Sequence, residues 1–279
     1  MKTQSILVIG ASGTVGAEVS RILKAQGHKV LEATSKRAPA DGKVFVDLTT
    51  GEGISAAFEH VDRAFLLSPP GYADQYAMLS PLIQEAKRRG LRKVVLMTAL
   101  GANASDSTPF RRAELELERS GLSYNIIRPN WFMQNFNSFW IQGIKEHGKV
   151  FLPAGTAKVG FIDARDISAV AAKLLVSEEL SNRAFDLTGP RALDHAEAAE
   201  LISKATGKTI GYQEITPEAF RSGLLGAGLP ADYVDFMVLI IGFLREGYNS
   251  AVTQNVEAIL GRSAIPFETY AKDFKISYL

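Results

Sequence analysis

The stretch that decides the fold opens the chain and reads Ile6-Leu7-Val8-Ile9-Gly10-Ala11-Ser12-Gly13-Thr14-Val15-Gly16. An apolar strand runs into glycines spaced three residues apart, and residues 14–26 then carry apolar side chains at helical spacing until Gly27. Such a turn presents backbone N–H groups and the positive end of a helix dipole to the pyrophosphate of a dinucleotide. We therefore predict a Rossmann-type turn that binds a dinucleotide through Gly10, Ala11, Ser12, Gly13, Thr14 and Val15. A bare tight turn in another kind of α/β protein is the alternative.

Strand and helix patterns alternate through the first two-thirds of the chain. The expected strands are 5–9, 29–34, 43–46, 63–67, 93–97 and 123–127, and the expected helices are 14–26, 51–59, 73–89 and 109–120. Strands such as Val94-Val95-Leu96-Met97 are almost continuously apolar, which is typical of a parallel sheet buried on both faces. We expect an α/β fold with a doubly wound parallel sheet of Rossmann type, which binds its ligand at the carboxyl ends of the strands.

Helical patterns dominate after Pro129. They cover 130–146, 166–176 behind Asp163 or Asp166, 194–206 behind Asp194, 216–226 with Thr216-Pro217 at its start, 230–246 and 253–260. One further strand, 183–187, is expected to rejoin the sheet. These patterns predict an NADP-binding Rossmann domain over 1–128 with about 157–190. A smaller, mainly helical substrate-binding lobe is expected over 129–156 and 191–279.

Composition excludes several classes of function. The 279 residues include 31 Lys and Arg against 30 Asp and Glu, for a net charge of +1, which argues against nucleic-acid or membrane-surface binding by bulk charge. The absence of cysteine excludes disulfides and thiolate chemistry, and the four histidines lack ligand spacing, so we expect no metal. The first strand begins too early for a leader peptide, and the apolar stretch 236–244 is too short to span a bilayer. We expect a cytoplasmic monomer or homodimer that acts on a small molecule.

The end of the second expected strand selects the cofactor. An acid at this position binds the ribose 2′-hydroxyl of NAD, whereas cationic and hydroxyl side chains favour the 2′-phosphate of NADP. Here the strand exits into Ser35-Lys36-Arg37, which suits a phosphate dianion. The sequence therefore favours NADP(H), although Lys36 and Arg37 are also what a solvated loop would carry.

Three further strand ends supply candidate cofactor contacts. Asp47 ends the third strand and is placed to contact the adenine edge or to cap the following helix. Ser68-Pro69-Pro70 follows the fourth strand, either as a wall of the nucleotide pocket or as a rigid connector. Pro129, after the sixth strand, completes the candidate cofactor-binding set.

Four motifs resemble those of one family. They are Gly10–Gly16, Val95-Leu96-Met97-Thr98-Ala99, the run 122–136 with Arg128-Pro129-Asn130-Trp131-Phe132-Met133, and Ile162-Asp163-Ala164-Arg165-Asp166-Ile167. Together they resemble the NmrA-like, atypical branch of the short-chain dehydrogenase/reductases. Within it the chain is similar, nearly end to end, to quinone and triphenylmethane-dye reductases and to reductases of ergot-alkaloid pathways. The resemblance implies NADP(H) lying across the strand ends.

The resemblance lacks one element of the usual chemistry. Standard short-chain dehydrogenases use a tyrosine and a lysine on one helix, with a serine after the fifth strand. Here Thr98 stands at the serine position, and the helix begins Pro109-Phe110-Arg111-Arg112-Ala113-Glu114, with neither tyrosine nor lysine. We therefore expect hydride transfer to a quinone, cationic dye or imine, which leaves little charge for an acid to neutralise. Thr98 is the candidate catalytic residue, as a donor to nicotinamide or substrate, or it is an ordinary strand-end threonine.

Aromatic residues after Arg128 suggest the acceptor site. The candidate substrate residues are Asn130, Trp131, Phe132, Asn135, Phe136 and Phe139. Such a set would suit a flat, conjugated molecule with few polar contacts. The alternative is that these aromatics only pack the helical lobe. The alternative function is a non-catalytic redox sensor that binds NADP(H) and a protein partner, as the regulators that give the family its name do.

Overall fold

Two units make up the chain in the computed structural model, which describes residues 3–37 and 40–279. The first unit comprises Met1–Arg128 and Ile167–Asp186, and the second comprises Pro129–Asp166 and Leu187–Leu279. Residues 1–2 and 38–39, which fall within the expected Rossmann domain, lie outside the described residues.

The first unit is built on a seven-stranded sheet in the order β3-β2-β1-β4-β5-β6-β8. Its strands are β1 (Ser5–Val8), β2 (Lys29–Thr34), β3 (Lys43–Phe45), β4 (Arg63–Leu67), β5 (Lys93–Met97), β6 (Tyr124–Pro129) and β8 (Arg183–Leu187). Strands β1 to β6 pair parallel to one another. This confirms the doubly wound Rossmann-type sheet, whose strand order reverses between β1 and β4, the usual place for a ligand.

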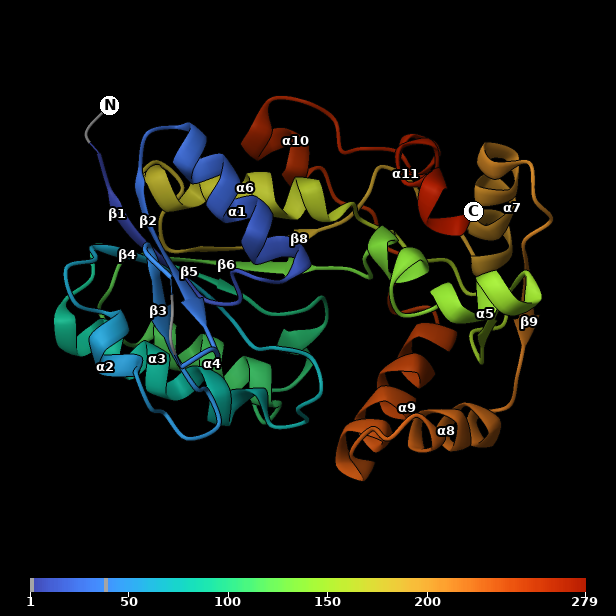
Figure 1. The fold of residues 1–279 in the computed structure, drawn as a ribbon, viewed down its shortest axis with the longest axis horizontal. Helices are drawn as coiled ribbons and strands as arrows, with labels where there is room; N and C mark the ends of the chain where they lie inside the picture. The colour runs from blue at the N-terminus through green and yellow to red at the C-terminus, as the bar shows by residue number, and fades with distance from the viewer. Residues whose placement is uncertain (1–2, 38–39) are drawn as a thin grey trace. The chain divides into compact units, whose positions relative to one another are not determined.

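Helices cover both faces of this sheet. Figure 1 shows α1 (Thr14–Ala25) and α6 (Ala164–Val176) on one face, and α2 (Ile54–Ala57), α3 (Gln75–Arg89) and α4 (Pro109–Glu118) on the other. All five residues of β4 are buried, which is why the strand is apolar from Ala64 to Leu67. The hydroxyl of Ser168 on α6 donates to the carbonyl of Val15 on α1 at 3.2 Å, so the two helices are joined directly.

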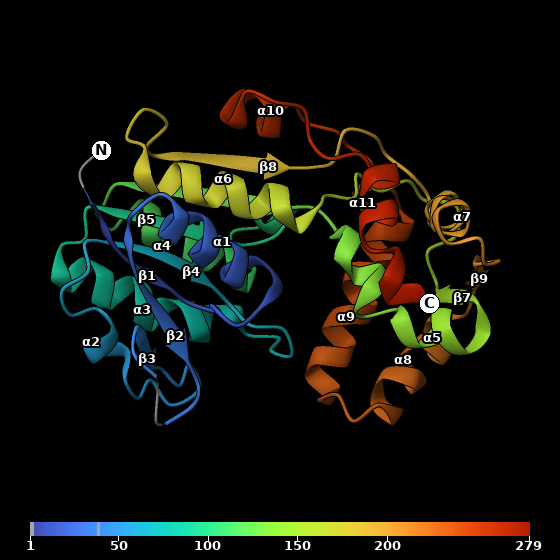
Figure 2. The ribbon, with the colours of Figure 1, turned by 45° about the horizontal axis from the view of Figure 1, so that its top comes forward.

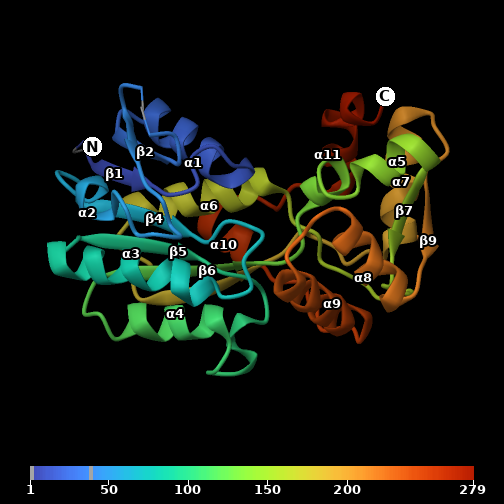
Figure 3. The same ribbon diagram turned by 60° about the horizontal axis from the view of Figure 1, so that its bottom comes forward.

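The second unit combines helices with a small parallel sheet of β7 (Lys149–Leu152) and β9 (Gly211–Glu214). Its helices are η2 (Met133–Asn137), α5 (Ile141–His147), α7 (His195–Thr206), α8 (Pro217–Gly226), α9 (Ala231–Arg245), α10 (Asn255–Leu260), α11 (Phe267–Asp273) and η3 (Lys275–Tyr278). The short 3-10 helix η1 (Ala102–Ala104) belongs to the first unit. Helix α7 packs against α11 (Figure 2), and α5 and α7 lie beside the paired strands (Figure 3).

The expected helix over 130–146 is wrong. Phe132 instead forms a parallel bridge with Ile162, and the N–H of Met133 donates to the carbonyl of Ile162 at 2.8 Å. The chain then makes the short 3-10 helix η2 and begins α5 only at Ile141. Apolar spacing suggested a helix because these side chains are buried, but the backbone hydrogen bonds go to a distant segment instead.

The second segment of the first unit, Ile167–Asp186, is shorter than the expected range 157–190. Val159 pairs with Leu193, and the N–H of Gly160 donates to the carbonyl of Asn249 at 3.0 Å, so residues 157–166 belong to the second unit. Strands β7 and β9 and helix α11, which are four to seven residues long, were not expected.

The predicted helix starts follow from capping chemistry. Asp194 caps α7 in a reciprocal capping box with Glu197, and Thr216 caps α8 ahead of Pro217. Helix α6 begins directly after Asp163, whose Oδ1 accepts from the N–H of Arg165 at 2.9 Å. Asp166 instead lies inside the first turn, where its carboxylate accepts from the N–H of Ile265 at 2.6 Å and pairs with Arg262.

An aromatic cluster around His195 fills the core of the second unit. The imidazole centroid lies 5.2 Å from both Trp140 and Phe161 and 6.1 Å from Phe136, each of them buried. Neither ring nitrogen has a hydrogen-bond partner among the described residues. Burial in this apolar cage lowers the pKa of His195 to about 4, so the ring is neutral at physiological pH.

Candidate active site

The glycine turn after β1 brings the start of α1 against the backbone of the turn. Gly10 has a φ of +70°, which favours glycine, and its carbonyl accepts from the N–H of Gly13 at 2.9 Å. A Cβ on Gly16 would collide with that same carbonyl oxygen, so a larger residue there would push the helix away. The first and third glycines are therefore required by the backbone geometry itself.

The N-terminal end of α1 is suited to an anion. Gly13 caps the helix without a side-chain hydrogen bond, and the first turn carries no acidic residue. Ser12, Gly13 and Thr14 are exposed, whereas Val15 is buried against the sheet. Accessible backbone amides at the positive end of a helix dipole fit the pyrophosphate of a dinucleotide.

The residues expected to bind a 2′-phosphate are exposed at the end of β2. Ser35, Lys36 and Arg37 all lie at the surface, and Glu32 turns away to pair with Lys24 at 2.5 Å. No acid therefore occupies the tip of β2 itself. One does approach from the next loop, because both terminal nitrogens of Arg37 donate to Glu52 at 2.9 Å.

Asp47 and the proline loop are ordered by local contacts. Oδ1 of Asp47 accepts from the N–H of Thr49 at 2.9 Å and from its hydroxyl at 2.6 Å, and these bonds hold the pKa of the carboxyl below its ordinary value. This geometry favours the capping alternative, here for a turn, over an adenine contact. Ser68 donates to the carbonyl of Pro69 at 3.3 Å, and Pro129 is buried as the last residue of β6.

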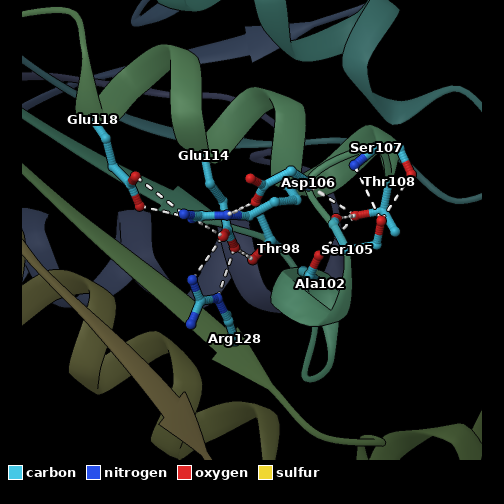
Figure 4. Close-up of polar contacts among 10 residues, drawn as sticks. Thr98, Ala102, Ser105, Asp106, Ser107, Thr108, Glu114, Glu118 and Arg128 are labelled. Carbon is cyan, nitrogen blue, oxygen red and sulfur yellow. Dashed lines mark hydrogen bonds and ion pairs between the residues drawn. The ribbon is translucent and has the colours of Figure 1, made fainter.

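Thr98 lies at the carboxyl end of β5 with its hydroxyl already engaged. Its side chain is buried, and Oγ1 donates to Oε1 of Glu114 on α4 at 2.7 Å (Figure 4). Its backbone N–H donates to the carbonyl of Ile127 on the neighbouring strand β6 at 3.0 Å. The threonine is therefore fixed by both its backbone and its side chain.

Glu114 is the centre of a buried charge cluster. It is fully buried and accepts from Nε and Nη2 of Arg128 at 2.8 and 2.7 Å, and from Nη1 of Arg111 at 2.9 Å. Burial pushes the pKa of Glu114 upward, but the hydrogen bonds from Arg128 and Thr98 outweigh it and hold that pKa below its ordinary value. An ionised carboxylate only accepts, so the hydroxyl proton of Thr98 is committed to Glu114.

Sequence reasoning missed this cluster, although a signal was present. Phe110, Ala113, Glu114 and Leu117 recur at the spacing of one helical face, and Ala113 and Leu117 are fully buried. An acid inside an apolar stripe requires a buried partner, and Arg128 near the end of the buried strand β6 supplies it.

The two arginines at the start of α4 are also committed. Besides Glu114, Arg111 donates to Glu118 at 2.8 Å, and the guanidinium of Arg112 lies 3.9 Å from the ring centroid of Tyr76. Both cations therefore already have partners in the protein.

The candidate substrate residues after β6 separate into two groups. Phe136 is fully buried and packs edge to face on Trp140, Phe161 and Phe267, so its place favours the packing alternative. Asn130 is also buried, and its amide donates to the carbonyl of Asn249 at 2.8 Å. The remaining members are half-buried or exposed, namely Trp131, Phe132, Asn135 and Phe139.

No group of three or more His, Asp or Glu residues able to hold a metal ion occurs in residues 3–37 and 40–279. Within the same ranges, none of the helices has the length and apolar character needed to cross a membrane.

The comparisons with known proteins identify the family. A model of the NmrA-like family matches residues 2–261. The chain belongs to this NmrA-like family. It is similar to the NAD(P)H azoreductase of Xenophilus azovorans, with 33% identity over 278 residues that cover 96% of each chain. The family resemblance predicted from the motifs is thereby confirmed.

Solved structures confirm the fold of this NmrA-like chain. It superimposes on Citrobacter sp. triphenylmethane reductase complexed with NADP(H) with a TM-score of 0.81 and 20% identity, covering 96% of this chain and 99% of that one. It also superimposes on NmrA, a negative transcriptional regulator in complex with NAD, with a TM-score of 0.76 and 15% identity, covering 98% and 95%.

Proposed function

We propose that this NmrA-like protein is an NAD(P)H-dependent oxidoreductase that transfers hydride directly to a small conjugated acceptor such as a quinone, a cationic dye or an imine. The relative from Xenophilus azovorans, named an NAD(P)H azoreductase, matches nearly the whole of both chains, which supports the general class. We also propose that the protein is cytoplasmic, that it is a monomer or a homodimer, and that it has no nucleic-acid partner.

The proposed coenzyme is NADP(H), held at the carboxyl ends of the strands. The amides of Ala11 to Thr14 would bind the pyrophosphate, and Ser35 and Lys36 would meet the 2′-phosphate. Ser68–Pro70 and Pro129 would border the nucleotide at the ends of β4 and β6. When bound, reduced nicotinamide supplies a hydride, which carries two electrons.

The hydrogen bond from Thr98 to Glu114 carries the proposal about the acceptor. In the usual chemistry of these folds a hydroxyl at this strand end helps a phenol protonate the carbonyl oxygen of the substrate. Here the hydroxyl of Thr98 donates its proton to the buried carboxylate of Glu114. Helix α4 carries no tyrosine, and its arginines already contact other side chains of the protein. The strand end therefore has an acceptor lone pair on Oγ1 but no side-chain proton donor at that position.

Acceptors that need no enzyme-bound acid fit this arrangement. A cationic dye that gains a hydride becomes neutral, so no proton is required. A quinone or an azo group gains a hydride from the enzyme and a proton from water, which balances the two-electron reduction. In both cases catalysis rests on positioning the acceptor against the hydride donor.

Flat aromatic surfaces would receive such an acceptor. Trp131, Phe132 and Asn135 follow the carboxyl end of β6 directly and keep accessible surface, as does Phe139. We propose these four as acceptor contacts, with Asn130 and Phe136 supporting them through their buried packing.

A non-catalytic redox sensor is the second candidate function. It is favoured by the same missing proton donor, since a sensor needs the nucleotide site but no chemistry, and by the fold that the chain shares with the regulator NmrA.

One experiment separates the two candidates. Purified protein is titrated with NADPH and NADH by nicotinamide fluorescence, and then mixed with quinones, cationic dyes, azo dyes and cyclic imines while NADPH absorbance is followed. We expect binding and turnover of at least one acceptor. Binding without turnover across the panel would favour the sensor, and failure of both coenzymes to bind would refute both functions.

A further inference from the structure

Arg37, the arginine expected to bind a 2′-phosphate at the end of β2, already forms an ion pair with Glu52. Arg37 donates from Nη1 and Nη2 to the two carboxylate oxygens of Glu52, each at 2.9 Å, and its guanidinium lies 5.1 Å from the ring centroid of Phe45. This fork-to-fork geometry is the one that arginine offers to a phosphate. A 2′-phosphate must therefore compete with Glu52 for the Nη1–Nη2 edge of Arg37.

The loop that carries Glu52 is tied to the end of β3. The backbone carbonyl of Glu52 accepts from the N–H of Asp47, and the carbonyl of Asp47 accepts from the N–H of Gly51, both at 2.9 Å. Gly53 follows with a φ of +85°, and a Cβ there would collide with the carbonyl oxygen of Phe45. The carboxylate is thus held beside the ends of β2 and β3, where a Rossmann fold receives the adenosine ribose.

The two coenzymes meet this pair differently. The phosphate of NADPH reaches the Nη1–Nη2 edge of Arg37 only by displacing Glu52, and elsewhere on the guanidinium it lies near a carboxylate that repels the dianion. The hydroxyls of NADH donate to a carboxylate, so NADH binds without breaking the pair. Ser35 and Lys36 remain open to either coenzyme, since both are exposed.

We propose that Glu52 is a specificity-determining residue, which lowers the preference for NADPH over NADH by holding Arg37. The inference rests on the proposed NAD(P)H-dependent function. Because the two side chains are 74% and 52% exposed, the size of the effect is that of a solvent-exposed ion pair.

The test compares Glu52→Gln and Arg37→Gln with the wild-type protein in fluorescence titrations with NADPH and NADH. We expect Glu52→Gln to tighten NADPH binding by about fivefold relative to NADH, and Arg37→Gln to weaken it by about fivefold. Glu18→Gln is the matched control, since Glu18 also makes a two-bond pair with an exposed arginine, Arg21, in the same unit. The control should leave the ratio of the two dissociation constants within about twofold of wild type.

The outcomes separate this inference from the function on which it rests. If wild type binds both coenzymes and Glu52→Gln leaves the ratio unchanged, or shifts it no more than Glu18→Gln, the role of Glu52 is refuted while the reductase remains. If wild type binds neither coenzyme, the proposed function and this inference are refuted together.

Discussion

Acidification is expected to destabilise the second unit through one buried side chain, His195. Its ring is enclosed by aromatic groups, and its pKa is lowered to about 4 from 6.5. Between these two values the unfolded chain binds a proton that the folded chain excludes. Stability therefore falls as the pH drops from 6.5 toward 4, and this contribution is constant above that window.

The magnitude follows from the difference in pKa. One pKa unit corresponds to about 1.4 kcal/mol, so the complete loss below pH 4 is about 3 kcal/mol, of which about 2 kcal/mol is already lost at pH 5. His195→Met removes the titrating group and keeps a similar apolar volume. Relative to wild type, the variant should gain about 2 kcal/mol of unfolding free energy between pH 7.5 and pH 5.

Urea denaturation followed by tryptophan fluorescence measures this difference. The two tryptophans, Trp131 and Trp140, both belong to the second unit, so the signal reports the unfolding of that unit. Phe161→Leu is the control, because it perturbs the same cluster without changing a titrating group and should destabilise equally at both pH values. If His195→Met and wild type differ by the same amount at pH 7.5 and pH 5, the reasoning is wrong.

Three further outcomes test the first unit. Gly16→Ala should weaken NADPH binding by about tenfold or more in a fluorescence titration, because its Cβ meets the carbonyl of Gly10; unchanged affinity would show that the turn is not the phosphate site. Thr98→Val should keep turnover of a quinone, which takes up a proton, within about threefold of wild type, whereas a loss of about 10²-fold or more would reveal that Thr98 is a proton donor. Glu114→Gln should destabilise the protein by about 3 kcal/mol in thermal unfolding, because Arg128 loses its buried counter-ion. Since the pKa of Glu114 is held below its ordinary value, this loss should be present at neutral pH and shrink as the pH falls through the folded-state pKa; a loss that does not depend on pH would count against the charge argument.

Local patterns were sufficient to predict the sheet. After their first residues, Arg63 and Lys93, β4 and β5 are short apolar runs bounded by loops, and their burial on both faces is what makes such runs apolar. The capping of α7 by Asp194 was likewise predictable, because a cap involves only residues of its own turn.

Features that depend on distant partners were beyond sequence reasoning. The apolar residues of 130–146 have helical spacing, yet Phe132 forms a bridge with Ile162, thirty positions further on. No local sequence pattern predicts that bridge. The ion pair between Arg37 and Glu52 was missed for the same reason. The sequence does not show that the two loops lie side by side, so Arg37 was expected to be free to bind a phosphate. Residue types thus predicted a nucleotide site, whereas the side-chain contacts of the candidate residues became visible only in the fold.

The division of the chain into interleaved units has a consequence for protein synthesis. The sheet of the first unit is completed by β8, Arg183–Leu187, which is made only after the whole segment Pro129–Asp166 of the other unit. Until then β6 is an edge strand, and the side-chain amide of Asn125 lacks the carbonyls of Leu180 and Arg183 to which it later donates. A nascent chain that stalls on the ribosome before residue 180 therefore exposes an open, aggregation-prone strand. For the same reason truncation after Arg128 would not give a complete first unit, and an expressible version would need residues 167–186 joined to it.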